Sequence, residues 1–170
     1  LGCGGYRLGW LTFPIELNNI FLESKSICSS IYSCPNLPVQ YATAEILKMD
    51  RIFFKHCNKI KNIFKNIVNE SCKILDQSKI MYIKPTSSWY IFLNFSNYKN
   101  KLKELEINNS YELSYYIINK FGIVNVAGEC FSCKGMNIRL SLVDIFLENN
   151  EYNYKNIINA IKILINWLNN

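Results

Sequence analysis

The long helical stretch in the middle of the chain constrains its fold more than any other feature. From Val39 to about Leu75 the residues favour one continuous helix, and apolar side chains recur along it at alternating four- and three-residue steps. This spacing forms one apolar stripe, which consists of Phe53, Cys57, Ile60, Phe64, Ile67 and Ile74. Lys55, Lys59 and Lys73 fall outside the stripe. A helix of this length is typical of one that bridges two bodies, so the sequence predicts two structural units.

Shorter elements are predicted on both sides of this stretch. Before it, the apolar run Leu8–Pro14 predicts a short buried strand, and residues 15–30 predict a helix. After it come four predicted strands, over Ile80–Ile83, Trp89–Phe95, Ile123–Val126 and Asn137–Val143, and two predicted helices, over Tyr111–Phe121 and Tyr152–Leu168. Asn109 and Gly122 suit the two ends of the first of these helices. This order predicts an α/β fold, with a small α/β sandwich from about residue 60 onward.

Composition and charge limit the class of protein. A chain of 170 residues with 49% hydrophobic and 19% charged residues is globular, and it can bury one domain plus the end of another. The net charge is +6, but the lysines are scattered among asparagines, and only Arg7, Arg51 and Arg139 are arginines. We therefore expect no nucleic-acid partner. No run of about 18 apolar residues occurs, so we expect no membrane-spanning segment and no membrane partner.

The cysteines suggest a reducing environment. Seven of them at irregular spacing favour reduced thiols in an intracellular protein over a secreted disulfide framework. Cys130 and Cys133 form one Cys-x-x-Cys pair, which invites a redox or zinc interpretation. However, no second pair follows at zinc-finger spacing, and the single histidine, His56, lies far away in the sequence. We therefore predict no metal site, and a structural or surface role for His56.

The first residues form a candidate anion site. The segment Gly2-Cys3-Gly4-Gly5-Tyr6-Arg7-Leu8-Gly9-Trp10 places four glycines around one arginine. Glycine lets the backbone approach a ligand closely, and a guanidinium is a planar fork of donors. The pattern thus indicates an anion held by backbone N–H groups and by Arg7. The alternative is that Arg7 forms an ordinary surface ion pair.

Arg139 is the second candidate binding residue. It lies in the middle of a predicted strand between Ile138 and Leu140, where a charge needs a partner. In an enzyme with an open site, that partner can be the carboxylate of a substrate. The alternative is a fixed ion pair with an internal carboxylate such as Asp144 or Glu129.

Six stretches of the sequence, taken in order, resemble one known family. They are GCGGYRLGW (2–10), SCPNLPVQYATAEIL (33–47), KPTSSWYIFLNF (84–95), SYELSYYIINKFGIVNVAGECF (110–131), NIRLSLV (137–143) and the last helix. Together they resemble the pyridoxal-phosphate (PLP)-dependent aminotransferases of fold type I, class I/II. The resemblance covers nearly the whole chain. Two residues depart from the family pattern: Ala127 stands where the family usually has proline, and Ser88 stands where many members have glycine.

The resemblance implies a domain organisation. Residues 1–58 would form the C-terminal end of the large cofactor-binding domain, including the start of the bridging helix, and residues 59–170 would form the small C-terminal domain. The chain would then be a C-terminal fragment of a longer protein whose Schiff-base lysine lies one or two residues before Leu1. No catalytic residue is expected in this chain, and the chain alone is expected to be inactive.

The resemblance also implies a function, namely a transaminase that moves an amino group between an amino acid and a 2-oxo acid through PLP. Arg7 is similar to the arginine that binds the cofactor phosphate, and Arg139 to the arginine that binds the substrate α-carboxylate. Two alternatives remain open. The protein could be another fold-type-I PLP enzyme, such as a lyase or decarboxylase, or a non-catalytic structural module.

Further expectations concern assembly and the pocket wall. The family builds its active site at a two-fold interface, so the resemblance implies a homodimer, with residues 33–36 facing the partner subunit. The reduced thiols lead us to expect an intracellular, cytoplasmic location. Trp89 and Tyr90 would be core residues or pocket wall near the substrate, with Ser87 and Ser88 keeping that wall narrow.

Overall fold

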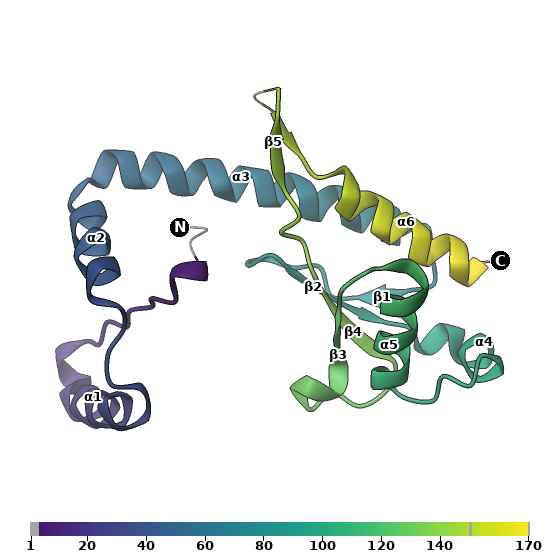
Figure 1. Ribbon diagram of the computed structural model, residues 1–170, viewed down its shortest axis with the longest axis horizontal. Helices are drawn as coiled ribbons and strands as arrows, with labels where there is room; N and C mark the ends of the chain where they lie inside the picture. Colours follow the sequence, from purple (N-terminus) through teal and green to yellow (C-terminus); the bar gives the residue numbers. More distant parts are fainter. Residues whose placement is uncertain (1–3, 150, 170) are drawn as a thin grey trace. The chain divides into compact units, whose positions relative to one another are not determined.

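The structure, a computed structural model, describes residues 4–149 and 151–169 (Figure 1). The chain divides into two compact units, Leu1–Lys61 and Asn62–Asn170. Helix α3 (Asp50–Leu75) contributes residues to both units. Helices and strands are mixed, which confirms the predicted α/β class. The domain assignment of residues 1–58 and 59–170 stays a prediction.

The described part of the first unit contains helices and irregular segments. Two short 3-10 turns, η1 (Gly4–Tyr6) and η2 (Ile15–Leu17), precede helices α1 (Asn18–Tyr32) and α2 (Leu37–Lys48). The helix predicted over residues 15–30 is confirmed, whereas the strand predicted over Leu8–Pro14 is wrong. A strand needs a neighbour to bond its backbone N–H and C=O groups, and the described residues of this unit include no strand.

The long helix predicted from Val39 to Leu75 is two helices, because the chain leaves the helical conformation at Met49. Met49 has φ −92° and ψ 53°, and its N–H bonds to the carbonyl of Ile46. Lys48 in the last turn of α2 and Asp50 in the first turn of α3 each suit the dipole of their own helix end. The predicted apolar stripe of α3 is confirmed, since none of its six side chains is exposed.

The second unit is built on a four-stranded antiparallel sheet with the strand order β1-β2-β4-β3. The strands are β1 (Met81–Tyr82), β2 (Tyr90–Asn94), β3 (Val126–Ala127) and β4 (Asn137–Ser141). The predicted strands contain β1, β2 and β4, whereas β3 begins only at the last residue of its predicted strand. Helices α4 (Lys99–Glu104), α5 (Ser110–Phe121) and α6 (Lys155–Asn169) complete this unit, together with the turns η3 (Ser96–Tyr98) and η4 (Gly128–Phe131).

A two-stranded hairpin precedes the last helix and was not predicted. Strand β5 (Phe146–Glu148) pairs antiparallel with β6 (Glu151–Asn153). Helix α6 therefore begins at Lys155 and not at Tyr152. The side chain of Asn153 accepts a hydrogen bond from the N–H of Lys155 at 3.0 Å, which helps to set this start. A strand of three residues is too short to show the alternation of apolar and polar residues from which strands are predicted.

The register between β2 and β4 gives the sheet one buried face and one open face. Ile91 pairs with Leu140, and Leu93 pairs with Ile138. All four side chains are buried in a core that also includes residues of α3, α4, α5 and α6. Because side chains alternate along a strand, the residues between them lie on the opposite, open face.

Helix α5 has the two ends that the sequence predicts. The side chain of Asn109 accepts a hydrogen bond from the N–H of Glu112 at 2.9 Å, and the Glu112 carboxylate accepts one from the N–H of Asn108 at 2.6 Å. This is a reciprocal cap of the kind that satisfies N–H groups at a helix start. Gly122 ends the helix in the left-handed conformation, with φ 67°. The cap fixes where α5 begins, and Ser110, its first residue, contacts turn η4.

Gly128 is a place where the fold accepts no side chain. A Cβ atom at this position would lie 2.6 Å from Cβ of Asn137 and 3.1 Å from its carbonyl oxygen. Neither atom is the free end of a flexible side chain. Glycine at this position therefore allows turn η4 to lie directly against strand β4.

We expect Gly128→Ala to lower the free energy of unfolding of the second unit by about 1–3 kcal/mol, the usual cost of overpacking a well-packed site. Chemical denaturation followed by tryptophan fluorescence measures the change. Val124→Ala is the control, because Val124 lies nearby between α5 and β3, is 79% exposed and should shift stability by less than about 0.5 kcal/mol. Equal stability of the two variants would contradict the close packing at Gly128.

Candidate functional site

Arg139 lies on the open face of the sheet in the second unit. It pairs with Phe92 of β2 on one side and with Val126 of β3 on the other. Its neighbours in sequence, Ile138 and Leu140, point into the core. The strand alternation therefore turns the Arg139 side chain away from the core, and the side chain is partly buried there.

Two aromatic rings flank the guanidinium of Arg139. Its Cζ atom lies 4.1 Å from the ring centroid of Tyr90 and 4.6 Å from that of Phe131. Both distances are well within the range in which a ring attracts a cation over its face. Tyr90 comes from β2, and Phe131 comes from turn η4. Residues from two different elements thus hold one charged group.

No carboxylate of the described residues pairs with Arg139. The ion pair with Asp144 or Glu129 that the sequence left open is not formed: Asp144 instead accepts a hydrogen bond from Asn156 at 3.0 Å. The Nε atom of Arg139 is buried and has no hydrogen-bond partner among the described residues. A guanidinium in this state retains its donors for a ligand anion.

The turn that carries Phe131 is itself held in place. The hydroxyl of Ser110, a fully buried residue of α5, accepts a hydrogen bond from the N–H of Glu129 at 3.1 Å. The ring of Phe131 also contacts the ring of Phe92 edge to face, with the centroids 6.1 Å apart. The position of Phe131 over Arg139 is thus fixed from α5 and from β2.

The aromatic residues before and at the start of β2 occupy different surroundings. Trp89 contacts the ring of Phe64 on α3, with the centroids 5.9 Å apart, and Phe64 packs against the core. Tyr90 faces Arg139 instead. The sequence singled out both residues as core or wall, but it gave no signal that Tyr90 contacts Arg139.

Arg7 lies in the first unit and is exposed. Its backbone has φ 57°, and both its N–H and its Nη1 atom donate to the carbonyl of Gly4, at 3.2 and 3.3 Å. Among the described residues, the guanidinium makes one long side-chain hydrogen bond, which leaves most of its donors available for an anion. Gly2, which the sequence placed in the same anion site, lies outside the described residues.

A broad hollow of about 1310 Å³ surrounds Arg7 within the first unit. Its polar lining includes Arg7, Lys25, Ser24 and Gln40, and its apolar lining includes Trp10. This donor set of a guanidinium, an ammonium, a hydroxyl and an amide suits a phosphate group. The surface ion pair that the sequence left open for Arg7 is not formed with any described residue.

The segment from Ser33 to Asn36 lines the same hollow and has clear local roles. Asn36 caps α2 by accepting a hydrogen bond from the N–H of Val39 at 3.4 Å. Gln40 donates to the carbonyl of Pro35 at 2.8 Å, which holds this segment against α2. Ser33 ends α1 with φ 58°.

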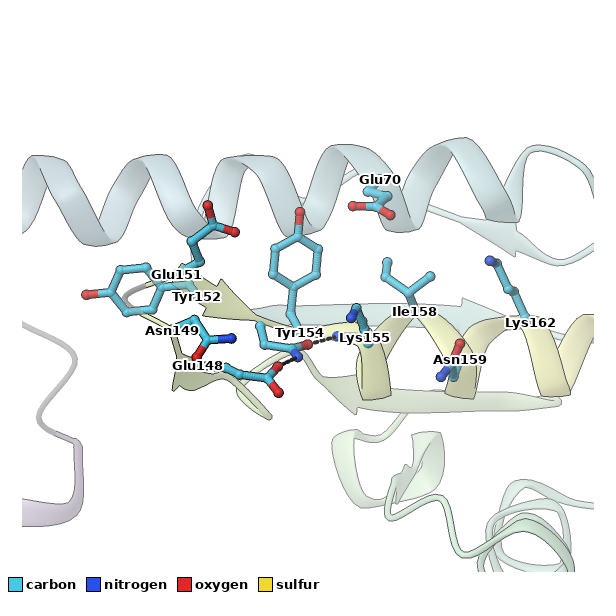
Figure 2. A pocket seen from close by; sticks show the side chains of 11 residues that line it. Glu70, Glu148, Asn149, Glu151, Tyr152, Tyr154, Lys155, Ile158, Asn159 and Lys162 are labelled. Atoms are coloured by element: carbon cyan, nitrogen blue, oxygen red, sulfur yellow. Dashed lines mark hydrogen bonds between the residues drawn. The ribbon is translucent and has the colours of Figure 1, made fainter.

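A second hollow, of about 600 Å³, lies between α3, the β5–β6 hairpin and α6 in the second unit (Figure 2). Glu70, Glu151, Lys155 and Lys162 line it with mixed charges, and neither Arg7 nor Arg139 does. Tyr154 points from the hairpin end of α6 toward Glu70 of α3 (Figure 2). Burial, and next the carboxylate of Glu70, raise the pKa of the Tyr154 hydroxyl above its usual range.

Cys130 and Cys133 are free thiols on either side of Phe131. The Sγ atom of Cys130 lies 3.8 Å from the hydroxyl of Tyr111. In the described part of the chain, no group of three or more histidine, cysteine, aspartate or glutamate residues is arranged to hold a metal ion. The pair belongs to the turn that carries Phe131.

The sequence matches one known protein family over most of its length. Residues 1–157 match the model of the class I and II aminotransferases. The chain belongs to the class I and II aminotransferase family. The predicted resemblance to PLP-dependent aminotransferases of fold type I is thereby confirmed.

The curated and solved relatives are longer than this chain. A protein of Aquifex aeolicus (strain VF5) named "Probable aspartate/prephenate aminotransferase" is 28% identical over 138 residues, which are 81% of this chain and 32% of that protein. The chain thus spans about a third of the length of this curated relative.

Two solved structures share the fold. They are a mutant aspartate aminotransferase of Thermus thermophilus (TM-score 0.69, 16% identity, 96% of this chain and 39% of that one) and an aromatic aminotransferase of Pyrococcus horikoshii OT3 (TM-score 0.70, 20% identity, 98% and 40%). None of the helices in the part of the chain described here has the length and apolarity needed to cross a bilayer.

At the two positions that depart from the family pattern, the backbone has a conformation that the family's usual residue also adopts. Ala127 has φ −59°, a value that proline also adopts. Ser88 has φ 68°, in the left-handed region that glycine occupies without strain. The structure thus keeps at both positions the backbone conformation that the family's usual residue favours.

We expect the Nε–H of Arg139 to exchange with solvent more slowly than the Nε–H groups of Arg7 and Arg51. The Nε atom of Arg139 is buried, whereas the side chains of the other two arginines are exposed. Nitrogen-15-resolved NMR of the three side chains measures the exchange rates, and Arg51 serves as the control. Similar rates at Arg139 and Arg51 would contradict the burial of this group.

Proposed function

We propose that the chain is part of a PLP-dependent transaminase, which moves an amino group between an amino acid and a 2-oxo acid. The observation that carries the proposal is the guanidinium of Arg139, which contacts two aromatic rings and has no anionic partner among the described residues. Membership of the aminotransferase family supports the reaction class. The longer relatives support a larger protein in which further residues come from outside this chain.

In this proposal Arg139 binds the α-carboxylate of the substrate. An amino acid and the 2-oxo acid formed from it carry the same carboxylate, so one arginine can serve both halves of the reaction. The guanidinium offers two parallel N–H donors to the two carboxylate oxygens. Binding at this point holds the substrate by a group that does not react, and it contributes equally to ground state and transition state.

The cofactor PLP suits the first unit. Its phosphate is an anion, and the free donors of Arg7 in a hollow that also contains Lys25 and Ser24 fit such a group. When bound, PLP supplies an electron sink for carbanion chemistry at the α-carbon. The part proposed for Arg7 is to hold the phosphate by charge-assisted hydrogen bonds.

The proposal includes the domain assignment and a homodimer. Residues 1–58 would belong to a large cofactor-binding domain and residues 59–170 to a small domain, with residues 33–36 near the partner subunit. A lyase or decarboxylase of the same fold is the competing function. A product assay distinguishes them, because only a transaminase converts an added 2-oxo acid into the corresponding amino acid.

Replacing Arg139 by Leu in the complete polypeptide should raise KM for amino acid and 2-oxo acid alike. The expected increase is roughly ten- to a hundredfold, because hydrogen bonds to a charged group are lost. Arg139→Lys should recover only part of this, since an ammonium is a point charge and not a fork. Arg51→Leu is the matched control on an exposed arginine. Equal wild-type kinetics toward amino acids and toward amines without a carboxylate would contradict this role.

Arg7→Ala in the complete polypeptide should weaken PLP binding by about 1.5–3 kcal/mol, because a charge-assisted contact to phosphate is lost. Titration of the apoprotein followed by PLP absorbance measures the affinity, and Arg51→Ala serves as the control. Pyridoxal, which lacks the phosphate, should bind the wild type and the Arg7 variant equally. Unchanged PLP affinity would mean that Arg7 has a structural role only.

A further inference from the structure

We propose that Tyr90 and Phe131 are positioning residues that hold the Arg139 guanidinium so that a substrate carboxylate can meet it only in its own plane. The inference rests on the proposed function of Arg139 and extends it to two residues that do not themselves bind the carboxylate. Both act through Arg139.

The first argument is geometric. The Arg139 Cζ atom lies 4.1 Å from the centroid of the Tyr90 ring and 4.6 Å from that of Phe131. At such distances a planar guanidinium stacks on an aromatic ring, and two stacked rings cover its faces. An anion can then approach only the edge, where the N–H donors point. In-plane approach is the geometry of a bidentate guanidinium–carboxylate pair.

The second argument concerns which edge of the guanidinium a carboxylate can reach. The Nε atom of Arg139 is buried with no partner among the described residues, so the edge that includes Nε is closed to solvent. The carboxylate therefore meets the two terminal Nη groups. A bidentate contact to these groups fixes the direction of the α-carbon along the axis of the guanidinium.

The third argument concerns the order of the side chain before substrate arrives. The Arg139 side chain makes no hydrogen bond or ion pair with any described residue, so polar contacts do not restrict its rotamers. Without the two rings, a long side chain of this kind would lose much conformational freedom when it binds an anion. Rings that hold it in advance remove that loss, which strengthens binding by pre-organisation.

The rings are themselves anchored independently of Arg139. Tyr90 is held in strand β2 by pairing with Ser141, and its ring lies 5.9 Å from that of Trp89. Phe131 contacts Phe92, and its turn is bonded to Ser110 of α5. Because the anchors lie on several elements, the clamp is a property of the folded second unit.

The test uses paired variants in the complete polypeptide that carries this chain. Tyr90→Leu and Phe131→Leu remove a ring, whereas Tyr90→Phe and Phe131→Tyr keep it. Tyr115→Leu is the control, because Tyr115 is 73% exposed on α5. Each Leu variant should raise KM for amino acid and 2-oxo acid by roughly five- to thirtyfold, the range of a partly desolvated cation–π contact. The ring-keeping variants should stay within about twofold of the wild type.

The same kinetics separate positioning from general damage. The effect should fall on KM, with kcat nearly unchanged, because the lost contact contributes equally to ground state and transition state. Amines that lack the carboxylate should show no change in any variant. A fall in kcat with all substrates would instead indicate a distorted site and would overturn the proposal.

A second measurement does not depend on activity. In the 170-residue chain, nitrogen-15 NMR of Arg139 reports both Nε–H exchange and the response to added propionate. The Leu variants should accelerate the exchange and weaken the propionate response, and the ring-keeping variants should do neither. Unchanged exchange and an unchanged response in both Leu variants would overturn the proposal.

The outcomes distinguish this inference from the function on which it rests. If Arg139→Leu leaves KM unchanged, the carboxylate role of Arg139 is wrong and the inference falls with it. If Arg139→Leu raises KM while the Tyr90 and Phe131 Leu variants behave like Tyr115→Leu, the function stands and the clamp is wrong. Phe131 is 45% exposed on a surface turn, so its pair of variants decides the question even if Tyr90→Leu fails to fold.

Discussion

The pairing register of β2 with β4 is the constraint on which the rest of the second unit depends. It places Ile91, Leu93, Ile138 and Leu140 on one face, where they form the core with four helices. The same register places Phe92 opposite Arg139 on the other face. A slip of β4 by one residue would turn its side chains to the opposite faces, burying the charge of Arg139 and exposing Ile138 and Leu140. Core packing therefore selects the face on which the arginine lies.

The two units differ in how many of their own residues bury one another within this chain. In the second unit, a hydrophobic core holds sheet and helices together. In the first, neither α1 nor α2 contains a buried residue. Its described structure rests on helix hydrogen bonds, on the cap at Asn36 and on the bond from Gln40 to Pro35. Local contacts of this kind hold the segments around Arg7, which lies on irregular backbone, whereas the other proposed donors lie on α1 and α2.

Much of the fold could be predicted from residue patterns, because local signals and packing agree. Helix α5 shows this best: Asn109 and Gly122 mark its ends in the sequence, and both have the predicted roles in the structure. The failures lie where tertiary structure decides. Leu8–Pro14 has the composition of a strand but no strand to pair with, Met49 interrupts an otherwise continuous helical pattern, and the β5–β6 hairpin is too short to show a period.

The candidate site likewise has features that the sequence predicts and features that it does not. The position of Arg139 in a strand followed from its apolar neighbours, and its exposure on the open face follows from strand alternation. Its aromatic neighbours could not be predicted. Contact with Tyr90 depends on the β2–β4 register, and contact with Phe131 depends on a turn fixed by Gly128 and Ser110. For Arg7, sequence and structure agree on available donors, and its ligand remains a proposal.

The most direct test of the central claim is an experimental structure of the complete polypeptide with a 2-oxo acid or a carboxylate inhibitor bound. The account predicts both carboxylate oxygens within hydrogen-bond distance of the Arg139 Nη atoms, in the plane of the guanidinium and between the rings of Tyr90 and Phe131. A carboxylate bound elsewhere, or an Arg139 side chain paired with a protein carboxylate while the ligand is bound, would contradict it.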